Sequence, residues 1–407
     1  MIDCEQAQKL IAEYSLSPRE EEILVAAALG RVNARDVLAP IALPVFDNSA
    51  MDGFVLNSRE TLGASVEKPV LLPVQGAVKA GDDKRLILGR HETLRIMTGS
   101  FIPQGADAVL AKENAVIHED TLVIQEPVPV GQNIRYKGEE IKKGSLVLAK
   151  NSIINPGTVG FLSAMGLEQI RVYQVPRISV IATGSELTAP GSVLGVGKIY
   201  DANTSMIRAA LEEMRIRPVF ARRMGDHPAQ IRKVIDFCLK ESDVVILMGG
   251  VSVGDFDFVK KILADAGVET VFWKVSQKPG KPLFFGKKEN RLVFGLPGNP
   301  ASVFTCFYEY VYPAIRRSMG YKNPYLSSEW IELGQPIKPD GQKTLFVKAR
   351  IEPAARVVIP LKNQKSHMLS SFCEADSFVV VPGSEKILEK GEKVKVHSLP
   401  YAVGGAR

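Results

Sequence analysis

Five carboxylate side chains in the middle of the chain lie at the ends of predicted strands or at the starts of predicted helices. Two of them follow a Gly- and Ser-rich turn that comes directly after an apolar run at 244–248. Backbone N–H groups of such a turn bind anions, and carboxylates beside a bound phosphate favour a hard cation such as Mg²⁺. The pattern predicts an anion site with a magnesium ion, although each carboxylate has the role of a helix N-cap as its alternative. The five are Glu186, Asp201, Asp226, Asp255 and Asp257, and the four Asp residues are the predicted metal ligands.

Three short turns supply further groups for a bound ligand. Each turn follows a predicted buried strand, and in a parallel sheet ligands bind beyond the carboxyl ends of the strands. Glycine allows the backbone of such a turn to bend sharply and to approach a ligand closely. The predicted substrate-binding residues of the three turns are Thr183, Gly184, Ser185, Gly249, Gly250, Ser252, Gly254, Pro297, Gly298 and Asn299.

Three lysines lie close together in the loop 273–282, which prolines and a glycine stiffen. They are Lys274, Lys278 and Lys281. Their ammonium groups can neutralise a multiply charged anion such as a phosphate or another oxyanion. A solvated run of charges is the alternative interpretation, and the flanking prolines count against it.

A third set of candidates lies nearer the N-terminus, in Gly-containing turns. It consists of Asp52, Thr98 and Arg135, and an ordinary turn is the alternative for each of them. His227 and His367 are single and unpaired by spacing, so the sequence does not favour either as a metal ligand.

The elements that must position these residues indicate an α/β domain at 175–323. Buried strands at 177–182, 218–221, 244–248 and 291–294 alternate with helical segments, which is typical of a doubly wound parallel sheet. The Gly-rich fingerprints of dinucleotide-binding proteins and P-loop proteins are absent from the sequence.

The remaining segments predict three further parts. Residues 1–42 and 143–174 form a split helical domain, with a second helix that starts at Ser17 and Pro18 and ends near Leu29. Residues 43–142 give short strands with Gly and Pro breaks, which predicts an inserted β domain. Residues 324–407 show the same pattern of short strands with Gly and Pro breaks, which predicts a C-terminal β-barrel or sandwich. One long helix is expected from Pro300 to Met319.

Composition narrows the class of protein. At 407 residues the chain is too long for one ordinary core, and its formal charge of +6 is spread rather than clustered. This favours small anionic ligands over nucleic acid. The four cysteines have no paired spacing, which argues against a disulfide framework or a zinc site and for a reducing compartment. The chain shows neither a signal peptide nor a stretch long enough to span a membrane, so a cytoplasmic location is expected.

Six motifs together resemble one known family over nearly the whole chain. They lie at 48–53, 95–99, 182–186, 249–255, 278–282 and 296–300. Their order is similar to that in the molybdopterin molybdenumtransferases of the MoeA family, which includes the E domain of gephyrin. The resemblance implies a multidomain α/β plus β protein with a split helical domain, an inserted β domain, a MogA-like α/β domain and a C-terminal β-barrel.

The resemblance also implies an activity and its site. The family acts as a homodimer on adenylylated molybdopterin and molybdate, uses Mg²⁺ and releases AMP as it forms molybdenum cofactor. The preceding molybdopterin adenylyltransferase is a candidate partner. Asp52 and Thr98 are expected to act from the partner subunit. The matched catalytic positions are Asp52, Thr98, Glu186, Asp226, Asp257, Lys274, Lys278 and Lys281, and Ser366 and Arg135 are expected to bind substrate.

Three departures from the family pattern leave alternatives open. Leu247 and Met248 replace a Thr-Ser pair, Lys365 replaces a glycine, and an Arg-rich stretch is altered at Tyr136. A tungstate-preferring variant and a non-catalytic molybdopterin-binding scaffold are therefore alternatives. The adenylyltransferase of the preceding step is a further one, and the extra β domains count against it.

Overall fold

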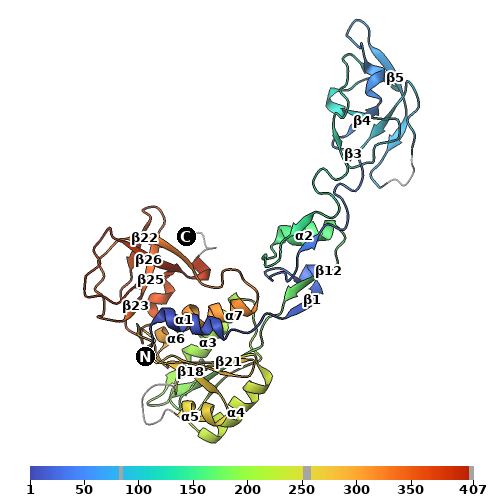
Figure 1. The fold of residues 1–407 in the computed structure, drawn as a ribbon. Coiled ribbons are helices and arrows are strands. Elements are labelled where there is room, and N and C mark those ends of the chain that lie inside the picture. The colour runs from blue at the N-terminus through green and yellow to red at the C-terminus, as the bar shows by residue number, and fades with distance from the viewer. Residues whose placement is uncertain (82–85, 251–257, 403–407) are drawn as a thin grey trace. The chain divides into compact units, whose positions relative to one another are not determined.

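The computed structural model describes residues 1–81, 86–250 and 258–402, which fall into two compact units (Figure 1). Unit 1 comprises Met1–Glu22, Arg31–Ala34 and Arg171–Arg407, and unit 2 comprises Ile23–Gly30 and Arg35–Ile170. Strands β1 (Glu20–Leu24) and β12 (Gln169–Tyr173) form a two-stranded sheet where the chain passes between the units. No helix among the described residues is long and apolar enough to cross a bilayer.

Unit 2 contains a six-stranded sheet in the order β7-β4-β6-β5-β9-β8. Apolar side chains of several of its strands, such as Leu56, Leu72 and Leu122, are fully buried and belong to the core of the unit. Helix α2 (Pro156–Ala164) begins at Pro156, because Asn155 accepts a hydrogen bond from the Thr158 N–H at 2.8 Å and Pro156 fits the first turn. The strands of the sheet are β4 (Gly53–Leu56), β5 (Val70–Val78), β6 (Thr93–Ile96), β7 (Ala108–Ala111), β8 (Val116–His118) and β9 (Thr121–Ile124). Smaller elements are β2 (Val37–Leu38) with β11 (Leu146–Leu148), β3 (Asn48–Ser49) with β10 (Ile134–Arg135), and the 3-10 turns η1 (Val25–Ala27), η2 (Ser58–Thr61) and η3 (Lys112–Asn114).

The centre of unit 1 is a six-stranded sheet in the order β16-β13-β17-β21-β20-β18. The first four strands are parallel, and β20 and β18 add antiparallel. Every residue of β17 (Val244–Met248) is buried, because helices cover both faces of the sheet. The other strands are β13 (Ile178–Thr183), β16 (Phe220–Met224), β18 (Glu269–Trp273), β20 (Phe284–Lys288) and β21 (Arg291–Leu296), and β14 (Leu187–Thr188) pairs with β15 (Ile199–Tyr200) beside them.

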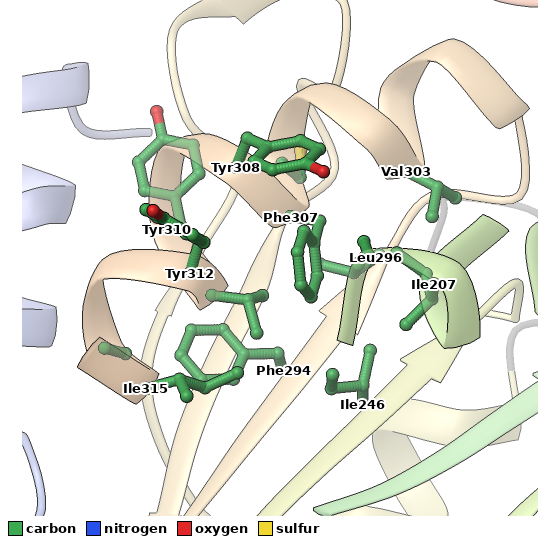
Figure 2. Close-up of a cluster of buried hydrophobic side chains, with 14 of the residues drawn as sticks. Ile207, Ile246, Phe294, Leu296, Val303, Phe307, Tyr308, Tyr310, Tyr312 and Ile315 are labelled. Atoms are coloured by element: carbon green, nitrogen blue, oxygen red, sulfur yellow. The ribbon is translucent and has the colours of Figure 1, made fainter. Parts of the chain in front are cut away.

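Alternate side chains of the parallel strands divide between two cores, one on each face of the sheet. Ile246 and Phe294 join the first core, which contains residues of α1, α3, α6 and α7 (Figure 2). Val245 and Val293 join the second core, which contains residues of α4 and α5. This confirms the predicted doubly wound domain. The helices are α1 (Cys4–Glu13), α3 (Ala202–Glu213), α4 (Pro228–Glu241), α5 (Phe258–Asp265), α6 (Pro300–Cys306) and α7 (Tyr312–Ser318).

A closed barrel of five strands follows, which confirms the predicted C-terminal β-barrel. Its strands run in the order β23-β24-β22-β26-β25, and β25 pairs again with β23. The short strand β19 (Gln277–Lys278), from the lysine-containing loop, adds parallel to β23. The barrel strands are β22 (Ser327–Leu333), β23 (Thr344–Glu352), β24 (Val357–Pro360), β25 (Ser377–Val381) and β26 (Lys393–Ser398), with 3-10 turns η5 (Ser370–Cys373) and η6 (Pro400–Ala402).

The second helix predicted for the N-terminal region, from Ser17 to Leu29, is wrong. That segment forms β1 and the short turn η1 instead. Exposure along β1 alternates with a period of two, and its backbone groups are paired with β12. A helix of about 12 residues is marginal in water without tertiary packing, so the available strand partner decides the local structure.

The single helix predicted from Pro300 to Met319 contains a π-helical segment, η4 (Phe307–Val311), between α6 and α7. Pro313 has no N–H group to donate to the carbonyl of Glu309, four residues earlier. That carbonyl instead accepts a hydrogen bond from Gln8 Nε2 at 3.3 Å. The helix therefore widens at this point, as helices do where the regular hydrogen-bond pattern is interrupted.

Candidate active site

A pocket of about 990 Å³ lies in unit 1, at the carboxyl ends of the parallel strands. Thr183 and Gly184 come from the end of β13, Met248 to Gly250 from the end of β17, and Pro297 to Asn299 from the turn after β21. The pocket therefore lies where ligands bind in sheets of this class. Residues 277–282 and the barrel residues 364–367 also line it.

The turn after β17 reaches the end of β13 because its first residue is a glycine. Gly249 has a φ of +88°, and a Cβ built on it would lie 2.5 Å from the carbonyl oxygen of Thr183. Any other residue would clash with that backbone atom and adopt a strained conformation. Gly249 thus allows two strand ends to line one space.

Among the described residues, three carboxylates line the pocket, namely Glu186, Asp201 and Asp226. Asp201 is buried and caps α3, where it accepts a hydrogen bond from the Thr204 N–H at 3.0 Å. Asp226 does not cap α4. Its Oδ2 accepts from the Ser185 N–H at 2.7 Å, and its own N–H donates to Ser185 Oγ at 2.9 Å.

This reciprocal pair fixes the turn after β13 against the turn after β16. Among the described residues, no three His, Cys, Asp or Glu side chains come together in a cluster that could hold a metal ion.

Part of the positive charge of the pocket comes from the loop between β18 and β20. Lys278 and Lys281 line the pocket, and β19 holds this loop to the barrel strand β23. Lys278 Nζ lies 2.9 Å from Asp340 Oδ2, and Lys343 Nζ lies 3.8 Å from the same oxygen. The hydrogen bond and charge of Lys278 lower the pKa of Asp340. Lys343, which also lines the pocket, adds a cation that the sequence did not indicate.

A barrel loop closes one side of the pocket. Ser366 Oγ accepts a hydrogen bond from Asn299 Nδ2 at 3.1 Å, and its carbonyl oxygen accepts one from the Ala301 N–H at 3.0 Å. Lys348 of the barrel strand β23 holds the loop, because its Nζ donates hydrogen bonds to the carbonyls of Asn363 and Met368 at 2.6 and 3.0 Å. Burial lowers the pKa of Lys348 to about 8. The loop is therefore attached both to the start of α6 and to the barrel.

Most of the predicted site residues of unit 1 are brought together. Lys274 is outside the lining: its backbone is left-handed at φ +72°, and its ammonium group lies 3.9 Å from the centre of the Trp273 ring. Ser185 contributes through its bonds to Asp226 rather than as a lining residue. Ser252, Gly254, Asp255 and Asp257 lie outside the described residues. The predicted residues that line the pocket are Thr183, Gly184, Glu186, Asp201, Asp226, Gly249, Gly250, Lys278, Lys281, Pro297, Gly298, Asn299 and Ser366.

The candidates nearer the N-terminus lie in unit 2. Asp52 Oδ1 accepts hydrogen bonds from the N–H of Thr98 at 2.7 Å and from Thr98 Oγ1 at 2.8 Å. Both hydrogen bonds lower the pKa of Asp52, and the one from the Thr98 backbone N–H has the larger effect. Arg135 lies on β10 and is exposed. Asp52 is therefore held as a charged and solvent-accessible carboxylate.

The sequence did not single out several residues of the pocket. Asn203 donates from Nδ2 to the carbonyl of Gly298 at 2.7 Å, and Gln277 lines the pocket although it is buried. His367 also lines the pocket. Of the two departures in β17, Leu247 lies wholly in the core, whereas Met248 lines the pocket. Only Asn203 had a local signal, since it falls in the polar start of α3.

The arrangement is suited to a ligand with several negative charges. Polar main-chain turns at three strand ends line the pocket, lysines offer compensating charge, and carboxylates offer oxygen ligands for a divalent cation. The pocket is as large as those that hold cofactor-sized molecules.

Comparison with known proteins identifies the family. Residues 2–166 match the MoeA N-terminal region (domain I and II), residues 179–317 match a probable molybdopterin binding domain, and residues 331–399 match the MoeA C-terminal region (domain IV). A molybdopterin molybdenumtransferase of Staphylococcus aureus (strain Mu50) is 33% identical over 394 residues, which cover 96% of this chain and 94% of that protein. One of Haemophilus influenzae is 32% identical over 415 residues and covers 99% of this chain and 100% of its own length.

Solved structures agree with this assignment. Two structures of the molybdopterin biosynthesis MoeA protein from Pyrococcus horikoshii have TM-scores of 0.85 and 0.80, at 30% and 28% identity. They cover 98% of this chain and 99% and 100% of theirs. The chain therefore belongs to the MoeA family of molybdopterin molybdenumtransferases, enzymes of molybdenum cofactor biosynthesis.

Proposed function

We propose that this chain inserts molybdenum from molybdate into adenylylated molybdopterin and releases AMP in a Mg²⁺-dependent reaction. The observation that carries this proposal is a pocket of about 990 Å³ in which acidic, basic and main-chain groups line one space at the strand ends. The phosphoanhydride of the pterin substrate requires main-chain turns and lysines that can bind its negative charges. The oxyanion co-substrate requires lysines for the same reason. Both requirements are met within unit 1.

Each group of the pocket has a distinct part in this proposal. The turns that contain Gly249 and Gly298 bind the phosphate groups through main-chain N–H donors. Lys278 and Lys281 attract molybdate and stabilise the charge that develops on the phosphate when the P–O bond to AMP breaks. Asn299 and Ser366, joined by a hydrogen bond, orient the substrate from the side of the barrel.

The donors in the pocket fit Mg²⁺ in their chemistry. Asp201 and Asp226 both line it, and one oxygen of each carboxylate accepts a hydrogen bond from a backbone N–H, which leaves the other oxygen for a hard cation. Asp255 and Asp257, proposed as the other ligands, lie outside the described residues. When bound, Mg²⁺ would neutralise charge on the phosphoanhydride.

We further propose that the enzyme is a homodimer and that Asp52 and Thr98 act on the reaction from the partner subunit. Mixing Asp52→Ala protomers with Asp257→Ala protomers should then restore part of the activity, because one site of the mixed dimer is intact. A mixture of wild type with the doubly substituted chain is the control for subunit exchange. Absence of restored activity, despite exchange, would refute the shared site. Direct transfer from the preceding adenylyltransferase is a natural extension, since its product is this substrate.

The central test is the reaction itself. The purified protein is incubated with adenylylated molybdopterin, Mg²⁺ and either molybdate or tungstate, and AMP release is followed. We expect oxyanion-dependent release that requires Mg²⁺ and falls in Lys278→Ala and Lys281→Ala. Lys386→Ala, a barrel-surface lysine paired with Glu392 at 3.3 Å, is the matched control. Binding of molybdopterin without AMP release would favour a scaffold, and release with tungstate alone would reassign the oxyanion.

A further inference from the structure

One buried amide lies directly behind the cationic loop of the pocket. Gln277 is 1% exposed, and its side chain takes part in hydrogen bonds at both ends. Nε2 lies 3.1 Å from the carbonyl oxygen of Pro279 and 3.3 Å from that of Gly280. Oε1 accepts a short hydrogen bond from the hydroxyl of Tyr310 and lies 3.6 Å from Cys4 Sγ.

These partners determine which way the amide points. Two carbonyl oxygens can only accept, so they require the NH₂ end of the side chain. A hydroxyl and a thiol face the oxygen end and donate to it. Turning the amide around would place three oxygens against one another in a buried site, which is costly because unpaired buried polar groups are expensive. The orientation of Gln277 is therefore fixed.

The amide also joins the pocket loop to two elements that take no part in the pocket chemistry. Tyr310 lies in the π-helical segment η4, beside residues of the first core (Figure 2), and Cys4 begins α1. The N-terminal residues add main-chain bonds, since the Ser276 N–H donates to the carbonyl of Ile2 at 2.7 Å. The loop between Lys278 and Lys281 is thus held from inside the protein, whereas its lysines are exposed to the pocket.

We propose that Gln277 is a positioning residue that holds the loop of Lys278 and Lys281 in the geometry needed to bind the tetrahedral oxyanion substrate. This inference rests on the proposed role of these two lysines in the pocket. Tyr310 acts through Gln277. Its hydroxyl fixes the orientation of the amide, so that the NH₂ group of Gln277 donates to the two carbonyls of the loop. Neither residue needs to touch the substrate.

The kinetic test replaces the amide by an apolar side chain of similar size. In Gln277→Met, kcat/KM for molybdate should fall roughly 10- to 100-fold, the effect expected when binding groups are displaced by about 1 Å. The loss should appear mainly in KM for molybdate, with a much smaller change in KM for the pterin substrate. A general loss of folding would instead reduce the active fraction and leave both KM values unchanged.

A matched pair of tyrosines separates the network from general packing. Tyr310→Phe should lower kcat/KM for molybdate about fivefold, the equivalent of one ordinary hydrogen bond. Tyr308→Phe should change it less than twofold, because the Tyr308 hydroxyl donates to Glu213 at 2.9 Å and not to the loop. Both residues are buried in the same helical segment, so the pair also serves if Gln277→Met does not fold.

A third variant tests the direction of the hydrogen bonds. Gln277→Glu places an acceptor against two carbonyls while it is ionised, but it offers an O–H donor when protonated. Its activity relative to the wild type should therefore rise as the pH falls. A flat ratio across pH would contradict the proposed role.

The inference is overturned if Gln277→Met keeps kcat/KM for molybdate within twofold of the wild type while Lys278→Ala lowers it. In that outcome the proposed function stands. It is also overturned if Tyr308→Phe lowers kcat/KM as much as Tyr310→Phe does. If Lys278→Ala and Lys281→Ala are both without effect, the role proposed for the lysines fails, and this inference fails with it.

Discussion

Replacing Gly280 with alanine tests how tightly the cationic loop of the pocket is packed. Gly280 has a φ of +92°, and a Cβ at this position would lie 2.5 Å from Cys306 Sγ and 2.7 Å from Gln277 Nε2. A left-handed conformation costs an L-residue about 1–2 kcal/mol, and forcing an extra group into a packed site costs about 1–3 kcal/mol. The lower entropy of the unfolded alanine chain offsets about 0.4–1 kcal/mol of this. We therefore expect Gly280→Ala to lower the unfolding free energy of unit 1 by about 2–4 kcal/mol.

Gly391 provides the matched control. Its φ is +89°, and a Cβ built on it would have no atom within 4 Å. Gly391→Ala therefore carries only the backbone cost, about 1 kcal/mol after the gain from the unfolded chain. The difference between the two variants reports the clash with Cys306 and Gln277, at about 1–3 kcal/mol.

Tryptophan fluorescence in a urea titration measures both variants, because the two tryptophans, Trp273 and Trp330, both lie in unit 1. The same preparations are assayed for AMP release. Gly280→Ala should also lower kcat/KM, since Gln277 can relieve the clash only by leaving the loop carbonyls, whereas Gly391→Ala should not. Equal stability losses in the two variants, together with unchanged activity in Gly280→Ala, would refute this reasoning.

Three further predictions address other parts of the site. Folding lowers the pKa of Lys348 from 10.5 to about 8. Between these pH values the unfolded state therefore binds more protons than the folded state does. The contribution of Lys348 to the unfolding free energy should consequently rise as the pH increases from about 8 to 10.5. The unfolding free energy of wild type minus that of Lys348→Met should rise over this range by at most about 3 kcal/mol, an upper bound that solvent screening reduces, and a constant difference would contradict the burial effect. Thr98→Val removes one of two hydrogen bonds to Asp52, so the pKa of Asp52 should move upward in an NMR titration, and an unchanged pKa would show that the hydroxyl is not its partner. In a double-mutant cycle, Asn299→Ala and Ser366→Ala should couple by about 0.5–1.5 kcal/mol in stability, and strict additivity would show that their hydrogen bond is not formed.

Much of the fold follows from local patterns in the sequence. The run at 244–248 is apolar on both faces, which identifies a central strand of a covered parallel sheet. Asn155 and Pro156 mark the start of α2 by chemistry that acts within one turn of helix. The strand that replaced the predicted helix at 20–24 had no such local signal. Its conformation depends on pairing with β12, which is about 150 residues away in the chain, and sequence-local rules do not contain that partner.

The candidate site divides in the same way. The sequence by itself determined the strand-end turns, such as the one at Gly249, and the lysines at 278 and 281, because residue type and spacing are enough to indicate an anion site. Only the tertiary structure showed that Lys343 joins them, that Lys274 faces a tryptophan ring, and that Gln277 holds the loop from inside the protein. The physical reason is that hydrogen bonds and packing act over a few ångströms in space, whereas Tyr310 and Cys4, which face the amide oxygen of Gln277, lie 33 and 273 residues from it along the chain.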